Sequence, residues 1–406
     1  MKSIIFHIDV NSAFLSWSAL EKLNNGSTVD LRTIPSIIGG DEKSRHGVVL
    51  AKSIPAKKYK IQTGEPVASA LRKCPSLVME PPDHDLYHRY SRSMMQLLQE
   101  FSPDLEQVSI DECYLDFTPI AHLYPSPEEA AARIRDRIFE ELHFTVNIGI
   151  SNTKVLAKMA SDFEKPGKIH TLYPEEIPVK MWPLPVGELF MVGQQSAKKL
   201  LGFGIRTIGD LAHADLHFLT THFKSHGQLM WEFANGMDES PVISKKQEAK
   251  GIGNSTTLGE DVTDSEKAKH VLLTLAESVS CRLREAGQLA GTITVEIKYS
   301  DFSKASHQMQ TLSPCSTTHD IYRMACSLFD ALWDGRPVRL LGIRSSRLIS
   351  TEDPIQLSLF DLPLPEMKEE AAQTAPSPEK LKKLDAAMDS IRQRYGKEAI
   401  KRGRFL

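Results

Sequence analysis

Three acidic residues are the first candidates for chemistry in this 406-residue chain. Asp9 follows the short apolar run 4–8, and Asp111 and Glu112 lie inside segment 106–117, which is rich in apolar residues. Carboxylate oxygens suit magnesium or manganese, and a divalent ion offsets the repulsion between neighbouring acids. Such a site is suited to phosphoryl transfer. The alternative, a solvated Asp-Glu turn, is disfavoured because the pair's apolar neighbours make free acids costly.

Lysines form a second group of candidates. Lys154 and Lys158 stand at helical spacing after an expected strand, and Lys165 lies just beyond that helix. Side chains in these positions can bind phosphates, although they can equally be ordinary helix-surface lysines. The same two alternatives apply to Lys57.

The segment Gly39-Gly40-Asp41-Glu42 resembles the signature of diguanylate cyclases. Lys43 stands where an aromatic residue is expected, and no second acidic strand has the spacing of a cyclase. We therefore interpret the match as coincidental and keep nucleotide cyclisation as a minor alternative.

Composition excludes several classes of protein. Hydrophobic residues at 41% and charged residues at 25% are ordinary for a folded chain, and this length predicts two to four domains at roughly 150 residues each. Five scattered cysteines without a CxxC pair argue against a disulfide framework and a cysteine zinc site, and they favour a reducing cytoplasm. His7 and Asp9 interrupt the N-terminal apolar run, so we expect no signal peptide or membrane span.

The distribution of charge along the chain is more informative about binding partners than the net charge is. The net charge of -3 gives no indication of a polyanionic partner. Residues 41–73 hold eight Lys or Arg against three acids, a balance of 8 - 3 = +5, whereas residues 93–132 hold eight acids and no Lys or Arg. We expect a cation to bind near the second segment.

Hydrophobic periodicity predicts a mixed α+β chain. In the first part it indicates a strand at 3–8, a helix at 13–23, two short strands within 106–117, a helix at 125–142, a strand at 145–150 and a helix at 152–163. Glycine-separated short helices are expected over 183–236, followed by helices at 264–286 and 317–333 and strands at 291–299 and 338–347. After Thr351 five prolines indicate a mobile tail that ends in a helix at 380–395 and a solvated basic end.

A short peptide in this tail has the composition of a docking motif. Its glutamine and apolar side chains would otherwise be left in water, with Leu357, Leu359 and Phe360 as the anchors. A stretch that folds back on its own domain is the alternative. The peptide consists of Gln356, Leu357, Ser358, Leu359 and Phe360.

Together the segments resemble the Y family of translesion DNA polymerases, in its bacterial polymerase IV branch. The resemblance covers roughly residues 1–360 and depends on the shared order of seven segments. They are IIFHIDVNSAF, GVVLAKSIPAKKYKIQTGEP, SIDECYLDF, NIGISNTKVLAKMASDFEKPGK, LFMVGQQSAKKLLGFGIRTIGDLA, KGIGNSTTL and QLSLF.

The resemblance implies an α+β multidomain fold shaped like a right hand. We expect a palm with a ferredoxin-like sheet, fingers, a helical thumb with a helix-hairpin-helix-like motif, and an α+β little finger. The implied ranges are palm 1–11 and 80–173, fingers 12–79, thumb 174–240, linker 241–250, little finger 251–350 and tail 351–406.

The resemblance also implies a catalytic centre. Asp9, Asp111 and Glu112 would hold two magnesium ions, with the backbone carbonyl of Val10 as a further ligand and manganese able to replace magnesium. Such a centre would join deoxynucleotides to a primer 3′ end.

Three further residues would meet the nucleotide. Phe14 matches the family's steric gate against ribonucleotides, with a core phenylalanine as the alternative, and Lys57 and Lys165 would contact the triphosphate. Two departures affect this part of the site. Lys57 replaces a usual arginine and so loses bidentate geometry, and Ile54 stands in place of a usual tyrosine.

DNA and a protein partner complete the implied function: low-fidelity, template-directed translesion synthesis without proofreading. The expected partners are primer-template DNA, dNTPs and the sliding clamp (beta subunit), which the tail peptide would bind; the chain would be a cytoplasmic monomer. A catalytically silent clamp- and DNA-binding accessory protein is the alternative.

The resemblance also implies contacts with DNA in two domains. In the thumb they are Gly202 and Gly204, although Gly193-Gln194-Gln195 departs from the usual Gly-Ile-Gly turn. In the last domain they are Arg336, Arg339, Arg344 and Arg347.

Overall fold

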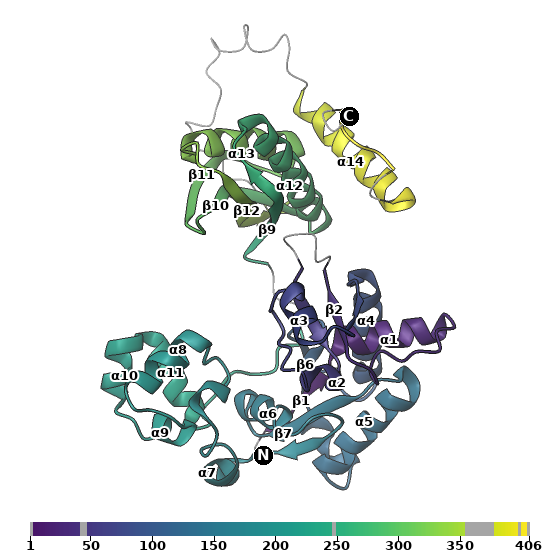
Figure 1. The fold of residues 1–406 in the computed structure, drawn as a ribbon, viewed down its shortest axis with the longest axis vertical. Coiled ribbons are helices and arrows are strands. Elements are labelled where there is room, and N and C mark those ends of the chain that lie inside the picture. The colour runs from purple at the N-terminus through teal and green to yellow at the C-terminus, as the bar shows by residue number, and fades with distance from the viewer. Residues whose placement is uncertain (1–2, 41–46, 246–248, 354–376, 397–398, 404–406) are drawn as a thin grey trace. The chain divides into compact units, whose positions relative to one another are not determined.

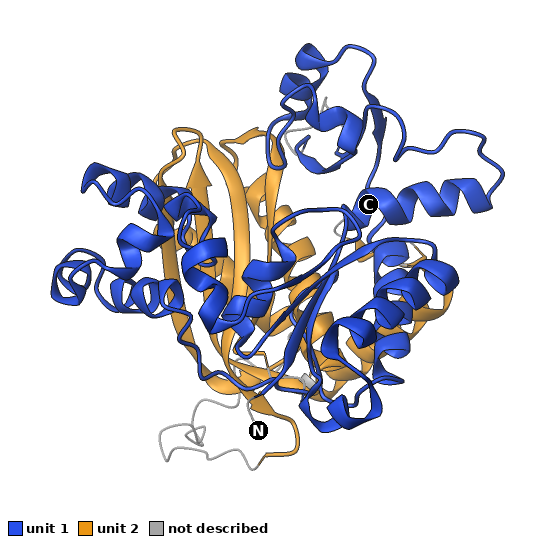
Figure 2. Cartoon of the chain, turned by 90° about the horizontal axis from the view of Figure 1, so that it is seen from below, with its two compact units in different colours: residues 1–246 blue, residues 247–406 orange. Residues whose placement is uncertain are grey.

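The structure is a computed structural model that describes residues 3–40, 47–245, 249–353, 377–396 and 399–403. The chain forms two compact units, Met1–Lys246 and Gln247–Leu406 (Figure 2). Each unit combines helices with a largely antiparallel sheet, which confirms the expected α+β multidomain class. The division falls within the expected linker at 241–250, and the finer division into palm, fingers and thumb remains a prediction.

The first unit is built on a five-stranded sheet with the strand order β5-β6-β1-β7-β8. The first strand of the chain lies in the middle, antiparallel to β6 on one side and to β7 on the other, while β7 and β8 are parallel. The strands are β1 (Ile5–Val10), β5 (Leu105–Gln107), β6 (Glu112–Asp116), β7 (Val146–Ser151) and β8 (Ile169–Thr171).

Alternation along β1 gives the sheet two different faces. Phe6, Ile8 and Val10 lie in the main core, where they pack with three helices: α1 (Ala13–Asn24), α4 (His84–Gln99) and α5 (Pro127–Leu142). Ile5 belongs to the opposite face, where it packs with a residue of α6 (Lys154–Ser161). The predicted helices 13–23, 125–142 and 152–163 are confirmed.

Helix α6 approaches the sheet closely because Gly149 of β7 lacks a side chain. A Cβ at this position would lie 2.0 Å from the Ala157 carbonyl oxygen and 2.5 Å from the Ser161 backbone nitrogen. No real side chain tolerates such contacts, so the glycine sets the separation between α6 and the sheet.

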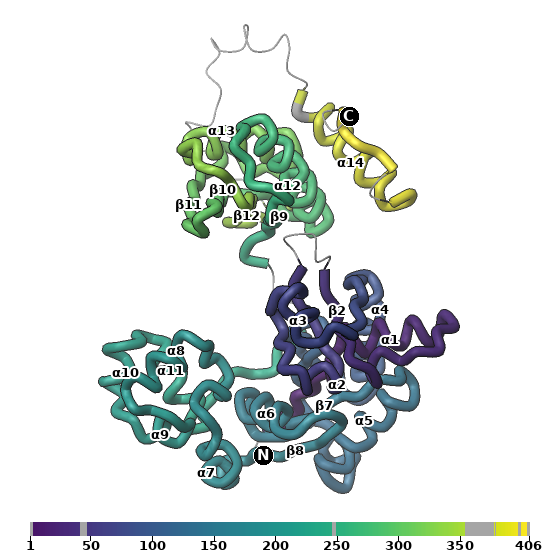
Figure 3. Tube along the Cα trace, viewed as in Figure 1, coloured from purple at the N-terminus to yellow at the C-terminus, as the bar shows by residue number. Residues whose placement is uncertain are grey.

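The rest of the first unit consists of a small sheet and a helical region (Figures 1 and 3). The small sheet has the order β3-β2-β4 and comprises β2 (Ser36–Gly39), β3 (Val49–Lys52) and β4 (Val78–Glu80), accompanied by α2 (Ile54–Lys57) and α3 (Val67–Lys73). The short helices expected over 183–236 are present as α8 (Gln194–Gly202), α9 (Ile208–Ala212), α10 (Leu216–Phe223) and α11 (Ser225–Ala234). The remaining pieces are α7 (Ile177–Lys180) and the 3-10 turns η1 (Thr118–Leu123), η2 (Pro174–Glu176) and η3 (Val186–Glu188).

The second unit is an antiparallel sheet of order β11-β10-β12-β9 with helices packed on one face. Its elements are β9 (Gly251–Val262), α12 (Ser265–Glu285), β10 (Gln288–Tyr299), β11 (Lys304–Cys315), α13 (Thr318–Leu332), β12 (Val338–Ser350) and α14 (Pro378–Tyr395). The hydrophobic pattern predicted α12, α13, β10, β12 and α14 but not β9 or β11. Among the described helices, none combines the length and hydropathy that a membrane span requires.

Candidate active site

The register of β1 and β6 brings the predicted acids to one end of two neighbouring strands. Asp9 is the register partner of Glu112, and the Val10 backbone N–H donates to the Asp111 carbonyl oxygen at 3.0 Å. Residues at alternate positions share a face, so Asp9 and Glu112 lie with His7 on the side that α6 covers. Residues about a hundred positions apart in the sequence therefore become neighbours.

Two of the lysines noted in the sequence reach these acids. Lys158 Nζ of α6 lies 2.9 Å from Glu112 Oε2, and Lys165 pairs with the Asp9 carboxylate. Asp162 lies between the lysines, 3.4 Å from Lys158 and 2.9 Å from Lys165. Lys154 is held elsewhere, because its ammonium group pairs with Glu106 at 2.7 Å.

Asp111 has a different environment. Its Oδ1 accepts a hydrogen bond from the Ser109 hydroxyl at 2.6 Å, and the described residues give it no cationic partner. Burial, followed by the charges of Asp9 and Glu112, raises the pKa of the Asp111 carboxyl. Four acids (Asp9, Asp111, Glu112 and Asp162) against two lysines leave a charge of 2 - 4 = -2 on this cluster.

His7 contacts the Glu112 carboxylate and orients it. The ring is buried, with Nε2 lying 3.3 Å from Glu112 Oε2 and Nδ1 lying 2.8 Å from the Ser161 hydroxyl of α6. The contact with His7 is the largest cause that lowers the pKa of Glu112 to about 2; Lys158 adds to it and burial opposes it. Burial lowers the pKa of His7 itself, which keeps the ring neutral at pH 7. The sequence pattern did not indicate His7 as a site residue.

A pair of buried asparagines holds the segment that carries Lys165. Asn147 Nδ2 donates to the carbonyl oxygens of Ser161 at 3.0 Å and Glu164 at 2.8 Å, and its Oδ1 accepts from Asn11 at 3.2 Å. Asn11 Oδ1 in turn accepts from the Gly167 backbone at 2.9 Å. Both asparagines were also missed, although a polar residue within an apolar strand, as at Asn147, is a signal that could have indicated it.

The carboxylates of this acid cluster suit divalent cations. Its oxygens are carboxylates, its net charge is negative, and one acid has a raised pKa without a neutralising cation among the described residues. In the present arrangement Asp9 and Glu112 are engaged by lysines, and no three His, Cys, Asp or Glu side chains in the described part of the chain are placed to hold a metal ion together. The predicted ligand set, including the Val10 carbonyl, therefore stays a prediction.

Phe14 and Lys57, predicted to meet the nucleotide, lie on separate helices. Phe14, in the first turn of α1, is half-buried and stacks on Tyr87 with ring centroids 4.4 Å apart and 12° between the planes. Lys57 is the exposed last residue of α2. Because the Phe14 ring is partly exposed, it is available to contact another molecule.

The open sheet face of the second unit forms a groove of about 690 Å³. Small side chains line it, including Gly253, Ser255, Thr294, Ser306 and Gly342, and Arg344 is the arginine in its lining.

The other predicted arginines are already engaged by protein groups. Arg336 lies 2.8 Å from Asp334, 3.3 Å from Asp301 and 3.8 Å from the centre of the Tyr299 ring. Arg339 stacks over Phe302, and Arg347 lies 3.4 Å from the Gln310 side-chain oxygen.

Two remaining groups of predicted residues can be placed only in part. Gly202 ends α8, and Gly204 has a φ of +84°, a conformation that favours glycine. The tail peptide 356–360 lies outside the described residues, as do Asp41 and Glu42.

Comparison with known proteins assigns the chain to a family. Residues 8–162 match the model of the impB/mucB/samB family, and residues 249–359 match the model of that family's C-terminal domain. A DNA polymerase IV of Clostridium acetobutylicum is 49% identical over 406 residues, which are 100% of this chain and 99% of the relative. The chain belongs to the Y family of DNA polymerases.

Further relatives agree with the Y-family assignment. The DNA polymerase IV of Acetivibrio thermocellus is 35% identical and covers 100% of this chain and 98% of its own, and DNA polymerase IV 1 of Bacillus subtilis is 37% identical with shares of 99% and 93%. The solved Y-family DNA polymerase chimera Dbh-Dpo4(243-245)-Dbh has a TM-score of 0.74 at 22% identity and covers 86% of this chain and 99% of its own. This structural likeness confirms the expected Y-family fold.

Proposed function

We propose that this chain is a template-directed DNA polymerase that adds dNTPs to a primer 3′ end and copies past damaged bases with low fidelity. As a Y-family member it is a DNA-directed DNA polymerase, uses DNA and nucleotides, and depends on a divalent metal. The observation that carries the proposal is the acid cluster of charge -2 at the ends of β1 and β6, in a chain whose full-length relatives are named DNA polymerase IV.

Asp9, Asp111 and Glu112, with the Val10 carbonyl, are proposed to hold two Mg²⁺ ions, which Mn²⁺ can replace. When bound, such ions activate the primer 3′-hydroxyl and neutralise the leaving pyrophosphate. The chain's own residues prepare this site. His7 and Lys158 hold Glu112 in one orientation, and Asn147 fixes the segment that carries Lys165.

Lys165 is proposed to contact the nucleotide triphosphate, together with Lys57. In the structure the Lys165 ammonium group bridges Asp9 and Asp162, so it already lies beside the proposed metal ligands. Phosphate oxygens compete with carboxylates for a lysine, and such an exchange would leave the Asp9 oxygens to the metal.

Phe14 is proposed to exclude ribonucleotides through its partly exposed ring, which Tyr87 supports by stacking. In Phe14→Ala we expect the efficiency of rNTP incorporation relative to dNTP incorporation to rise about tenfold or more over the wild type. The reason is that the loss of one steric contact of this kind is worth about 1–3 kcal/mol. Single-nucleotide incorporation with matched dNTP and rNTP measures the ratio. An unchanged ratio would count against the gate.

The remaining partners are also proposals. Gly202, Gly204 and the four arginines of the second unit would contact the DNA backbone, and peptide 356–360 would bind the sliding clamp and so raise the local concentration of the enzyme at primer ends. We further propose a cytoplasmic monomer without a proofreading activity.

Primer extension with the Asp111→Ala/Glu112→Ala variant tests the central proposal. Loss of both acids is expected to reduce extension by about a thousandfold or more, because the charge that binds the metal is removed. Asp136→Ala/Glu140→Ala removes two exposed acids of α5 and is the matched control. Extension that survives the first double substitution would refute the polymerase assignment, and a wild-type chain that binds DNA without extending it would favour the accessory-protein alternative.

A further inference from the structure

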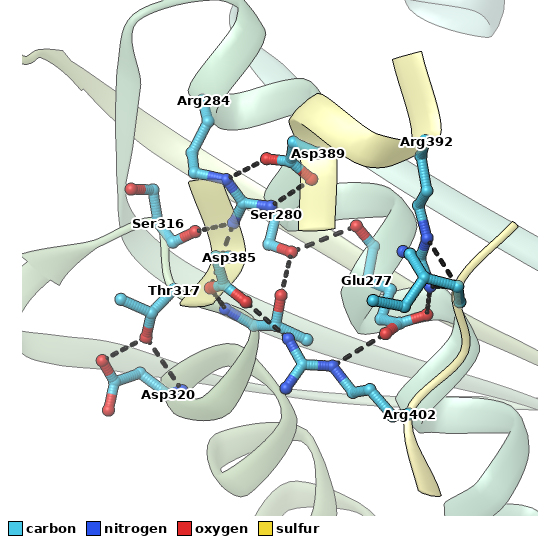
Figure 4. A network of polar contacts seen from close by, with 12 residues as sticks. Glu277, Ser280, Arg284, Ser316, Thr317, Asp320, Asp385, Asp389, Arg392 and Arg402 are labelled. Carbon is cyan, nitrogen blue, oxygen red and sulfur yellow. Dashed lines mark hydrogen bonds and ion pairs between the residues drawn. The ribbon is translucent and has the colours of Figure 1, made fainter. Parts of the chain in front are cut away.

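The C-terminal segment, defined here as residues 377–396 and 399–403, is fastened to the helices of the second unit by a network of charged groups (Figure 4). On α12, Arg284 forms a two-pronged contact with Asp389 of α14, with Nε at 2.7 Å and Nη2 at 3.0 Å from its carboxylate oxygens. Arg284 Nη1 also lies 3.3 Å from Asp385. Bidentate contacts of this kind fix orientation as well as distance.

Asp385 joins the C-terminal segment to α13. Its Oδ2 accepts a hydrogen bond from the backbone N–H of Thr318, the first residue of α13, at 2.8 Å, and its other oxygen pairs with Arg402. A carboxylate at a helix N-terminus satisfies a free N–H and interacts favourably with the helix dipole. Only 3% of Asp385 is exposed, so these contacts form away from water.

Ion pairs of the opposite polarity also join the two sides, with the acid on α12 and the arginines on the C-terminal segment. Glu277 of α12 accepts from Arg402 at 2.7 Å and from Arg392 at 3.2 Å. Arg392 further donates to the carbonyl oxygen of Ile400, which ties the residues after α14 back onto that helix. Each side of the contact thus contributes both signs, and three arginines meet three acids, so a shifted register would oppose like charges.

The C-terminal segment buries fewer apolar side chains than the core helices do, and Leu381, Ile391 and Ile400 are only half-buried. Met388, with 5% exposure, is the one buried apolar side chain among the described residues of the C-terminal segment, while Leu384 is 46% exposed. Helices α12 and α13, in contrast, each supply several fully buried side chains to the core. An element that is held mainly by charged groups, with few apolar side chains in the core, opens at a lower free energy than the domain unfolds.

We propose that the C-terminal segment is a salt-sensitive clasp on the α12–α13 face, which opens and closes while the rest of the second unit stays folded. When it is closed, the chain that follows β12 is attached to the same domain at both of its ends. This chain contains the peptide 356–360, so, if that peptide binds the clamp as proposed above, the clasp controls how the binding peptide is presented. Attachment at both ends reduces the conformational entropy lost on binding, so the closed state is expected to bind the clamp more tightly.

Hydrogen exchange of the full-length chain tests the clasp directly. We expect amides of α14 to exchange about threefold faster at about 1 M salt than at about 0.1 M, because pairs that are this far buried are screened only weakly, and those of β10 and β12 to be unchanged. Arg284→Gln and Arg402→Gln should accelerate the same amides at low salt. Arg394→Gln, which removes an exposed arginine from the same helix, is the control and should have no effect.

Two results would overturn the proposal. One is exchange of α14 at the same rate as β10 and β12 at every salt concentration, which would make the helix part of the core. The other is an equal effect of all three arginine substitutions. Hydrogen exchange of the wild-type chain over a series of salt concentrations needs no variant. It therefore tests whether the clasp opens even if Arg284→Gln folds poorly.

Binding to the sliding clamp separates this inference from the proposed function. Opening the clasp with Arg402→Gln is expected to weaken clamp binding about threefold, and deleting residues 356–360 should abolish it. If the deletion has no effect, the clamp-binding proposal fails, and the clasp is judged from hydrogen exchange alone. If the deletion abolishes binding but Arg402→Gln leaves it unchanged, the link between clasp and clamp is refuted.

Discussion

Asp111 and Glu112 are adjacent in the chain, yet their carboxylates have opposite electrostatic environments. Glu112 is held by His7 and Lys158, whereas Asp111 has a serine hydroxyl and two neighbouring negative charges. The first environment stabilises the ionised acid and the second destabilises it. The difference arises because side chains at successive positions of an extended chain point in different directions, so that only Glu112 lies over α6.

These environments predict opposite effects on stability. At pH 7 Asp111→Asn should raise the thermal unfolding midpoint by about 1–2 °C, because it removes an unfavourable charge, and Glu112→Gln should lower stability by on the order of 2 kcal/mol. Since the pKa of Glu112 falls from 4.5 to about 2 on folding, its contribution is present above pH 4.5 and is lost as the pH falls toward 2. Thermal unfolding of both variants at pH 7 and at lower pH measures these differences. Shifts of the same sign would contradict this account.

The sequence singled out the acids and Lys165, which the structure brings together and whose roles remain predictions, but it did not indicate the residues that position them. His7 and Asn147 are buried polar side chains whose partners, Ser161 and Glu164, come from distant segments. Their roles depend on contacts across strands and on the placement of α6, which single-residue patterns do not encode. Likewise, only the fold shows that Lys158 and Lys165 pair with the acids of this cluster, whereas Lys154 pairs with Glu106.

Among the elements, α6 decides the geometry of the site because it supplies Lys158 and Ser161 from one face. Its closeness to the sheet depends on Gly149, which lies opposite His7 in the register of β1 and β7. A glycine within an otherwise apolar strand thus marks a close approach of a helix, and not a turn.

Substitution at Gly149 tests this dependence. We expect Gly149→Ala to destabilise the first unit by about 3 kcal/mol and to reduce primer extension, because α6 must move away from the sheet. Gly259→Ala, on β9 where no atom lies within 4 Å of the added Cβ, is the control. Chemical unfolding and extension assays measure both effects. Full activity in Gly149→Ala would show that the site tolerates a displaced α6.

The sequence predicted the helices α1, α5, α6, α12 and α13 well, and it missed the polar edge strands β9 and β11. β9 contains three glycines within its twelve residues, and β11 is a largely exposed strand at the sheet edge that includes Pro314. Neither strand has the alternation of apolar and polar residues that indicates a half-buried strand. Each forms because it pairs with a neighbouring strand, β9 with β12 and β11 with β10, and this pairing is not visible in the local sequence. Conversely, the tail expected to be mobile and to end in solvated charges includes α14 and Arg402, and both form ion pairs with α12.

For the whole molecule, a net charge of -3 must be reconciled with binding to a polyanion. Binding then depends on where cations are free to meet phosphates and not on their number. Arg344 lines the open groove of the second unit, whereas Arg336 is neutralised by two aspartates. The four arginines predicted from the sequence are therefore not equivalent.

This difference predicts unequal effects on DNA affinity. Arg344→Ala should weaken binding and reduce the slope of log affinity against log salt by about 1, and Arg336→Ala should change the slope much less. Fluorescence anisotropy of a labelled primer-template over a series of salt concentrations measures both quantities. Equal slopes for the two variants would show that Arg336 leaves its aspartates when DNA binds.

The position of β1 in the middle of its sheet has a consequence for synthesis on the ribosome. Both neighbours of β1, the strands β6 and β7, are translated more than a hundred residues after it. Until then the nascent chain must keep an apolar segment with two unpaired edges from associating with other polypeptides. The topology that brings Asp9 and Glu112 together therefore also implies a slow, non-local folding step and a need for chaperone protection until β6 and β7 have been translated.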